Sequence, residues 1–320
     1  MGRRALIIGV NEYDHGKNLK GCVHDAQEIK RVLNRHAHNE EEEKNFDTEL
    51  ITTDTHKISS NSLRDKIEDL FRDQRSISLL YFSGHGYVDN LGGYLMTPEC
   101  TRGAEGISMN EVLTMANKSP ANNRIIILDC CHSGALGENN LNKNLTSITE
   151  GVAILTASTG IQLATEKKGS GVFTNLLIHA LEGGAANILG EVTAGNIYGY
   201  IDKAMGSEKQ RPMFITNIRR YDILRKVFTQ LKLNELRKIT TLFDDGPNMS
   251  YQLDPTYEEE SELAVLENVK KFKLLQKYNR VNLVIPIEAP HMFHAAMENK
   301  SCALTSLGKS YWIMVKNDII

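Results

Sequence analysis

Six short apolar runs, separated by segments with helical spacing, constrain the fold of this chain more than any other feature. The runs are only a few residues long and mostly lack polar alternation, which is typical of parallel strands covered on both faces of a sheet. They occupy residues 5–10, 50–53, 78–82, 125–128, 152–157 and 213–215.

The segments between the runs favour amphipathic helices. Residues 25–35 place Ala26, Ile29, Val32 and Leu33 on one face, as a helix packed on a sheet requires. Ser108 and Glu111 have the spacing of a capping box, which predicts a helix start. The expected helices span residues 25–35, 60–71, 108–116, 173–181 and 193–204. This alternation predicts an α/β fold with a mainly parallel six-stranded sheet between helices and right-handed crossovers.

Composition narrows the class of protein. Apolar residues make up 41% of the 320 residues, enough for a sizeable core, so collagen-like and wholly disordered chains are excluded. No apolar run reaches the roughly 18 residues that span a bilayer, and the first run is too short for a signal peptide. The net charge of −3 lacks the basic excess of nucleic-acid-binding proteins. Five cysteines are too few, and odd in number, for a disulfide framework, which favours free thiols in the cytoplasm.

The strand–helix alternation stops near residue 221, which predicts two domains, 1–220 and 221–320. In the second domain, residues 223–242 and 258–278 are expected to be helices and residues 281–287 a short strand. The pattern favours a small helix-rich domain, with a winged-helix-like arrangement as one candidate.

Two of the apolar runs end in residues that can carry chemistry. The run at 78–82 continues into Ser83-Gly84-His85-Gly86, and the run at 125–128 continues into Asp129-Cys130-Cys131-His132-Ser133-Gly134. Ligands of open α/β sheets bind beyond the carboxyl ends of the strands. We therefore expect both clusters to belong to one site.

A thiol and an imidazole at such a site predict a cysteine nucleophile with a histidine base, because the imidazole converts the thiol to a thiolate. The N–H groups of Gly86 and of the nucleophile are the expected donors to a developing oxyanion. Taken singly, His85 could be a capping residue and either cysteine a small buried side chain. A zinc site is disfavoured because adjacent residues of a strand point to opposite faces. The single Gly9 does not make a dinucleotide-binding motif.

The two clusters resemble the motifs of caspase-type cysteine peptidases, most closely those of metacaspase-like members. Ser83-Gly84-His85-Gly86 is similar to the histidine motif of the family, and the cluster from Asp129 to Gly134 is similar to its Asp-x-Cys-His-Ser-Gly motif. The interval from His85 to Cys131 is 46 residues, close to the roughly 50 of caspases. The resemblance covers about residues 4–220 and implies the caspase-hemoglobinase fold. It assigns Cys131 as the nucleophile and His85 as the general base, with Cys130 directed into the core.

The resemblance also implies which peptide bond is cut. Metacaspases cut after Arg or Lys and hold the basic side chain with acids, whereas true caspases cut after Asp and use arginines. Asp25, in the segment Gly21-Cys22-Val23-His24-Asp25, and Asp129 stand where the family places pocket residues, and carboxylates make charge-assisted contacts with basic side chains. Further candidates for this pocket are Cys22, Ser83 and Glu166.

Alternatives stay open for each acid. Asp25 could favour a helix N-terminus, Asp129 could hold the turn after its strand, and Glu166 could be a surface residue. Within the peptidase class, the second candidate for specificity is cleavage after Asn or Asp.

Regulation is a further implication. The segment after Cys131 contains Lys143, a candidate for self-cleavage, although activation without cutting is equally compatible. Domain 221–320 resembles modules appended to bacterial caspase-like effectors of immunity or cell death, which implies protein substrates and an activating partner or nucleotide signal. Calcium dependence occurs among metacaspases, but the four consecutive glutamates at 40–43 show no ligand pattern, so no cofactor is expected. The rival hypothesis is a catalytically weak caspase-fold module that binds a partner or senses a nucleotide.

Overall fold

The computed structural model describes residues 2–37, 43–89, 92–101, 106–130, 148–157, 166–167, 170–206, 211–219 and 222–320. The chain divides into two compact units, Met1–Phe228 and Thr229–Ile320. Within the described residues, no helix is long and apolar enough to cross a membrane.

A six-stranded sheet forms the centre of the first unit, in the order β12-β8-β7-β3-β1-β2. Five strands run parallel, and β12 runs antiparallel to its neighbour β8. The strands coincide with the six apolar runs, so the α/β fold with a mainly parallel sheet is confirmed. Their bounds are β1 (Arg3–Gly9), β2 (Asp47–Thr52), β3 (Ile77–Gly84), β7 (Asn123–Cys130), β8 (Val152–Thr156) and β12 (Met213–Asn217).

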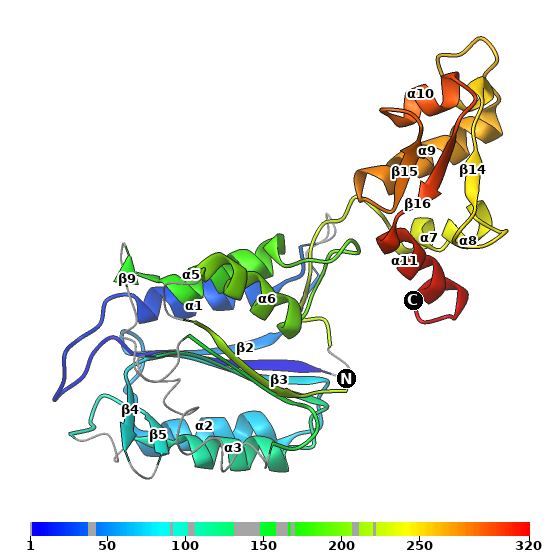
Figure 1. The fold of residues 1–320 in the computed structure, drawn as a ribbon. Coiled ribbons are helices and arrows are strands. Elements are labelled where there is room, and N and C mark those ends of the chain that lie inside the picture. Colours follow the sequence, from blue (N-terminus) through cyan, green and yellow to red (C-terminus); the bar gives the residue numbers. More distant parts are fainter. Residues whose placement is uncertain are drawn as a thin grey trace. The chain divides into compact units, whose positions relative to one another are not determined.

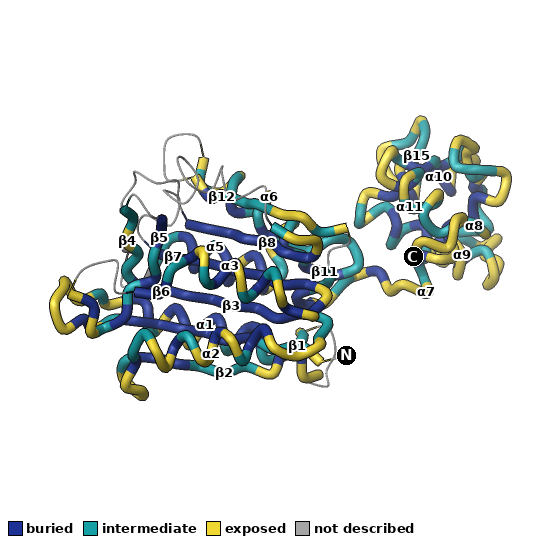
Figure 2. The backbone as a smooth tube through the Cα atoms, turned by 90° about the horizontal axis from the view of Figure 1, so that it is seen from below, coloured by how far each residue is buried: buried dark blue, intermediate teal, exposed yellow. Residues whose placement is uncertain are grey.

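Helices cover both faces of this sheet (Figure 1). On one face lie α1 (Cys22–Asn34), α5 (Val172–His179) and α6 (Ala194–Met205), and on the other lie α2 (Ser60–Arg72) and α3 (Met109–Lys118). Each face has its own apolar core, and the central strands are buried along nearly their whole length (Figure 2). Burial on both faces is the reason that these strands lack polar alternation in the sequence.

The helix start predicted at Ser108 is confirmed, because Ser108 is the N-cap of α3, but Glu111 does not complete a capping box. The Ser108 side chain does accept a hydrogen bond, from the Asn110 N–H. Glu111, however, pairs with Arg64 of α2 at 2.5 Å instead of reaching back to the cap. A tertiary ion pair takes the place of the local hydrogen bond that a capping box would make.

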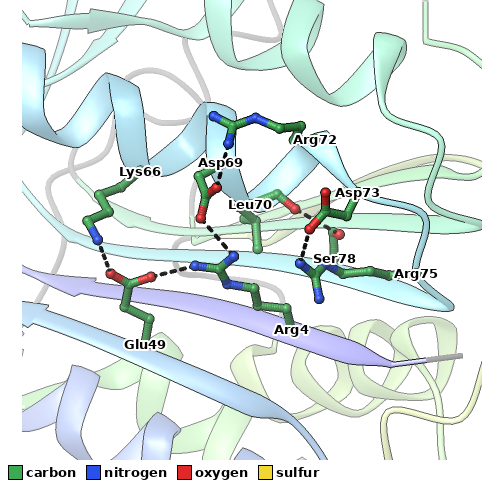
Figure 3. Close-up of polar contacts among 9 residues, drawn as sticks. All are labelled: Arg4, Glu49, Lys66, Asp69, Leu70, Arg72, Asp73, Arg75 and Ser78. Carbon is green, nitrogen blue, oxygen red and sulfur yellow. Dashed lines mark hydrogen bonds and ion pairs between the residues drawn. The ribbon is translucent and has the colours of Figure 1, made fainter.

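Charged side chains tie the amino-terminal end of the sheet to α2 (Figure 3). Arg4 of β1 pairs with Glu49 of β2 at 2.9 Å and with Asp69 of α2 at 2.8 Å. Lys66 of α2 contacts the other oxygen of Glu49 at 2.6 Å. The network joins β1, β2 and α2, and its pair of Arg4 with Asp69 links residues that are far apart in the sequence.

Short strands form two separate small sheets near the carboxyl-terminal end of the central sheet. β4 (Gly86–Asp89) follows β3 after one residue and pairs antiparallel with β5 (Gly92–Leu95), which pairs with β6 (Ile107–Ser108). β9 (Glu166–Lys167) and β10 (Ser170–Gly171) form a second antiparallel pair before α5. Both pairs lie at the end of the sheet opposite the N-terminus (Figure 1).

The predicted helix over residues 223–242 is wrong. Arg225 and Lys226 form β13 (Arg225–Lys226), which pairs with β11 (Glu191–Val192) of the first unit. The Arg225 guanidinium donates to the carbonyls of Arg35 and Leu181. These tertiary bonds override the local helical pattern, and only α7 (Leu233–Leu236) and α8 (Ile239–Leu242) remain of it.

The second unit is a three-stranded antiparallel sheet with helices, in the strand order β14-β16-β15. Its long helix begins at Leu266, later than predicted, and a short 3-10 turn, η5 (Pro255–Tyr257), precedes it. Phe272, Tyr278 and Cys302 are among its buried core residues. The remaining bounds are β14 (Ser250–Gln252), α9 (Leu266–Arg280), β15 (Val284–Ile287), α10 (Met292–Met297), β16 (Ser301–Leu304) and α11 (Ser306–Lys316).

Candidate active site

The two strand ends singled out in the sequence are neighbours in the sheet. β3 and β7 run parallel in a register that pairs Ser83 with Asp129 and Gly84 with Cys130. The next residues along the two strands are His85 and Cys131. Cys131 and the proposed self-cleavage residue Lys143 lie outside the described residues.

His85 is held by two hydrogen bonds. Its backbone N–H donates to the Tyr13 hydroxyl at 2.7 Å, and its ring Nε2 lies 2.7 Å from the Lys17 carbonyl oxygen. A carbonyl oxygen can only accept, so Nε2 carries the proton and Nδ1 is left as the nitrogen that can take one. This tautomer suits a general base.

Tyr13 lies directly against the histidine. The two ring centroids are 4.7 Å apart, and the tyrosine is almost fully buried. Burial raises the pKa of Tyr13 well above its usual value, even though the hydrogen bond from His85 acts in the opposite direction. The phenol therefore stays neutral and serves as a fixed acceptor. A Cβ on Gly84 would lie 2.7 Å from its hydroxyl, so this contact requires a glycine before His85.

The β4–β5 ladder sets the direction of the Gly86 N–H, which the sequence analysis expects to be an oxyanion donor. The Met96 N–H donates to the His85 carbonyl at 3.0 Å, which makes residues 85 and 96 a hydrogen-bonded pair of the β4–β5 ladder. In an antiparallel ladder, hydrogen-bonded pairs alternate with non-hydrogen-bonded pairs. Gly86 and Leu95 form the next pair along the ladder, which is a non-hydrogen-bonded one. Its N–H therefore points away from β5.

Asp25 of α1 and Asp129 of β7 converge on Gly171, and we call them the carboxylate pair. Both are almost fully buried, at 2% and 7% exposure. The Gly171 N–H donates to Asp25 Oδ2 at 3.1 Å. A Cβ on Gly171 would lie 2.5 Å from Asp129 Oδ2 and 3.3 Å from Asp25 Oδ2. Two carboxylates so close and so buried favour a cationic ligand.

A chain of hydroxyl groups orients Asp129. Thr174 of α5 donates to Asp129 Oδ2 at 2.6 Å, and the Tyr81 hydroxyl lies 2.6 Å from the Thr174 oxygen. Because the Thr174 proton goes to the carboxylate, Tyr81 is the donor in the second bond. Burial and the nearby charges of Asp129 and Asp25 raise the pKa of Tyr81 well above its usual value, which keeps its proton in place.

The structure brings most of the other pocket candidates to the same place. Ser83 is buried and lies between Gly9 and Asp129 in the register of the sheet. Cys22 is buried at the start of α1, where its N–H donates to the Asn11 side chain at 2.9 Å. The backbone of Glu166 pairs with Gly171 across β9 and β10, while its side chain lies outside the described residues.

Cys130 is confirmed as a core residue. It is 3% exposed and belongs to the core under α2 and α3. Cys302, in the second unit, has its pKa raised to about 12 by burial, so its thiol is unreactive at neutral pH. In the described part of the chain, no group of three or more His, Cys, Asp or Glu side chains is arranged to hold a metal ion.

Several contributors to the site escaped the sequence analysis, among them Tyr13, the Lys17 carbonyl and Thr174. Tyr13 and Lys17 follow the end of β1, which reaches the same edge of the sheet as β3 and β7. The rule that ligands bind beyond the strand ends could therefore have indicated them. Thr174 lies inside an apolar helix, and nothing in its local pattern distinguishes it.

Comparisons with known proteins find metacaspases among the relatives of this chain. Metacaspase-6 of Arabidopsis thaliana is 30% identical over 151 residues, covering 42% of this chain and 39% of that protein. Metacaspase-1 of Coccidioides immitis (strain RS) is 30% identical over 149 residues, covering 42% of this chain and 31% of that protein. The chain thus spans less than half the length of these curated relatives.

Solved structures share the fold. The crystal structure of caspase-1 from Spodoptera frugiperda has a TM-score of 0.51 at 14% identity and covers 70% of this chain and 90% of that one. Protein GSU0716 from Geobacter sulfurreducens has a TM-score of 0.52 at 16% identity and covers 71% of this chain and 98% of that one. The family model of the caspase domain, Peptidase C14, matches residues 2–222. Since that match includes the whole central sheet and both strand ends, this chain belongs to the caspase domain family.

Proposed function

We propose that this chain is a cysteine endopeptidase that cuts peptide bonds after Arg or Lys. The observation that carries the proposal is the carboxylate pair, which lies beside the strand ends that lead to His85 and Cys131. A guanidinium or ammonium group entering between Asp25 and Asp129 would form charge-assisted hydrogen bonds in a buried setting. An acidic side chain would meet two like charges there.

The reaction follows from the proposed roles of the residues. His85 Nδ1 takes the proton of the Cys131 thiol, and the thiolate attacks the carbonyl carbon of the bond to be cut. The N–H groups of Gly86 and Cys131 hold the oxyanion that forms. His85 then gives its proton to the leaving amine, and the amine departs from the acyl-enzyme. Water, deprotonated by the same imidazole, releases the acid product and restores the thiol.

Fluorogenic peptides ending in Arg, Lys, Asp or Asn test this proposal. We expect turnover after Arg or Lys that is lost in Cys131→Ala and in His85→Ala but kept in Cys302→Ala, a matched thiol removal in the second unit. Turnover after Asp or Asn would overturn the assigned specificity. If wild type and Cys131→Ala were equally inactive with every peptide, partner and nucleotide tried, the rival module for binding or sensing would be favoured.

The same proposal gives the second unit a regulatory role. An enzyme that cuts after Arg or Lys would damage many proteins of the cytoplasm, where we place it, so a unit that restrains it has a physical purpose. An activating partner or nucleotide would shift the population towards the active form, as in an effector of bacterial immunity or cell death. Mass spectrometry of the activated protein checks self-cleavage at Lys143, and only intact chain would contradict it.

A further inference from the structure

The ring of His85 lines a second hollow, separate from the carboxylate pair, and we call it the His85 hollow. Its volume is about 490 Å³, and its lining includes Tyr13, Lys17, His85, Tyr87, Met96 and Cys100. That volume is large enough for a side chain of any size with part of its backbone. The proposed cleavage uses His85 and Gly86 from this lining but assigns no ligand to the space itself.

The two sites lie on opposite faces of the sheet. Asp129 lies two residues after Ile127 in β7 and therefore on the same face of the sheet, which α1 and α5 cover. Its side chain contacts Thr174 of α5. Tyr13 and Cys130 belong to the core under α2 and α3, and Met96 packs against that same core. His85 stands at the strand end between them, with its ring on the side of the hollow.

We propose that the His85 hollow binds the side chain of the residue that follows the cut bond, and that it prefers a large apolar side chain. The inference rests on the proposed peptidase function. The same imidazole must give its proton to the leaving amine, so the residue that carries this amine has to lie beside the His85 ring. If the side chain of the residue before the cut binds at the carboxylate pair, the substrate peptide continues from there towards the opposite face of the sheet, where the hollow lies.

The lining sets the preference for an apolar residue. Tyr13 and Tyr87 contribute aromatic rings, and Met96 contributes a flexible apolar side chain that adapts to different shapes. Among the described residues that line the hollow none is acidic, whereas His15 and Lys17 add basic groups. A Lys or Arg after the cut would meet positive charge here, which is the opposite of the environment at the carboxylate pair.

Paired peptides that differ only after the cut test the inference. We would compare Arg-Leu, Arg-Gly and Arg-Lys at the cleavage position, using kcat/KM from mass spectrometry. The kcat/KM of the Arg-Leu peptide is expected to exceed that of the Arg-Gly peptide about tenfold, because the Leu side chain moves from water into the hollow. The Arg-Lys peptide is expected to have the lowest kcat/KM. Met96→Ala and Tyr87→Ala should each bring the Leu-to-Gly ratio down towards one. Tyr87 is 42% exposed, so its replacement does not threaten the fold.

The ratio is measured within one variant, so a general loss of activity does not affect it. Met115→Ala, in the groove between α2 and α3, is the matched control and should keep the wild-type ratio. A wild-type ratio near one, or a ratio that Met96→Ala and Tyr87→Ala leave unchanged, would overturn the inference while the cleavage after Arg stands.

A binding measurement covers the case of no turnover. Fluorescein-labelled Arg-Leu and Arg-Gly peptides would be titrated into Cys131→Ala and followed by fluorescence anisotropy. Tighter binding of the Leu peptide that disappears in Cys131→Ala/Tyr87→Ala supports the hollow. A protein that neither cuts nor binds either peptide would overturn the proposed function and this inference together. Cleavage after Asp alone would overturn only the specificity for Arg and Lys, and Asp-Leu against Asp-Gly would then give the same ratio.

Discussion

At the scale of single residues, the hydroxyl of Tyr13 decides how firmly His85 is held. Tyr13→Phe removes the acceptor of the His85 N–H and leaves that group unpaired in a site that is closed to water on the Tyr13 side. A lost neutral hydrogen bond is worth about 1–1.5 kcal/mol, so kcat/KM should fall about tenfold.

Steady-state kinetics across a pH range check this role. Because the pKa of Tyr13 lies well above its usual value, the phenol does not titrate in the working range. The shape of the pH profile should therefore be the same in Tyr13→Phe and wild type. Tyr198→Phe, on α6, is the control and should change neither rate nor profile. If one of the pH-dependent limbs of the wild-type kcat/KM profile were absent in Tyr13→Phe, Tyr13 would do more than position His85.

The carboxylate pair makes a separate prediction about specificity. Asp25→Asn or Asp129→Asn keeps the shape of the side chain but removes one charge from the proposed binding site of the basic residue. Hydrogen bonds to charged groups are worth about 1.5–3 kcal/mol, so kcat/KM for Arg peptides should fall by roughly 10- to 100-fold. For peptides with norleucine in place of Arg, the same substitutions should lower kcat/KM much less.

The comparison of Arg and norleucine substrates separates charge from structure. Asp65→Asn, an exposed acid on α2, should leave both rates unchanged. An equal loss of kcat/KM for both substrates would mean that the two aspartates only stabilise the fold. Asp25 would then act as the N-terminal acid of α1, and Asp129 would hold the turn after β7.

At the scale of the elements, the sheet was predictable and the segment after it was not. Strands buried on both faces, such as β3 and β7, have a continuous apolar pattern that few other structures produce. Residues 223–242 have a helical pattern as well, yet Arg225 finds the carbonyls of Arg35 and Leu181. Those partners are distant in sequence, so no local pattern contains them. The convergence of Asp25 and Asp129 was suggested by motif, but Tyr13 and Thr174 depend on the same kind of distant contact.

The ion-pair network of β1, β2 and α2 gives a prediction about stability and pH. Burial alone would raise the pKa of Glu49, but hydrogen bonds from Lys66 and Arg4 outweigh it and bring the pKa below its ordinary value of 4.5. A carboxyl whose pKa is lower in the folded than in the unfolded protein stabilises the fold at pH values above its unfolded-state pKa. This contribution is lost as the pH falls through its folded-state pKa.

Glu49→Gln should therefore lower the free energy of unfolding at pH 7 by about 0.5–1 kcal/mol. The difference from wild type should shrink below about pH 4. Urea denaturation at pH 7, 5 and 3.5 measures this, with Glu68→Gln on the exposed side of α2 as the control. A difference that is constant over the three pH values would show that the charge of Glu49 is not the cause.

At the scale of the whole molecule, the caspase domain ends later in the chain than its family model does. The family model stops at residue 222, whereas the compact first unit runs to Phe228. The intervening residues belong structurally to the sheet domain. Leu224 is 1% exposed, and its N–H donates to the Val192 carbonyl at 2.7 Å. Val227 is buried too, and its N–H donates to the Gly190 carbonyl at 2.8 Å.

A chain of residues 1–228 should consequently fold alone, while a chain of residues 1–220 should be much less stable. The shorter chain loses the buried Leu224 and the Arg225 bonds that satisfy the carbonyls of Arg35 and Leu181. Removal of one large apolar side chain from a core costs about 2–5 kcal/mol. At about 2–4 °C per kcal/mol for a domain of this size, Tm should fall by about 4–20 °C.

Calorimetry of the two chains tests the boundary, and Arg-peptide cleavage by residues 1–228 tests the proposed restraint. If the second unit holds the enzyme inactive, residues 1–228 should cut without any activator, and adding residues 229–320 as a separate chain should slow them. The second unit has its own sheet and core, so it can be supplied in this way. Equal Tm values for the chains 1–228 and 1–220 would place β13 outside the caspase domain. Inactivity of a folded 1–228 chain would instead make the second unit a required activator, because its removal would then have taken away something that catalysis needs.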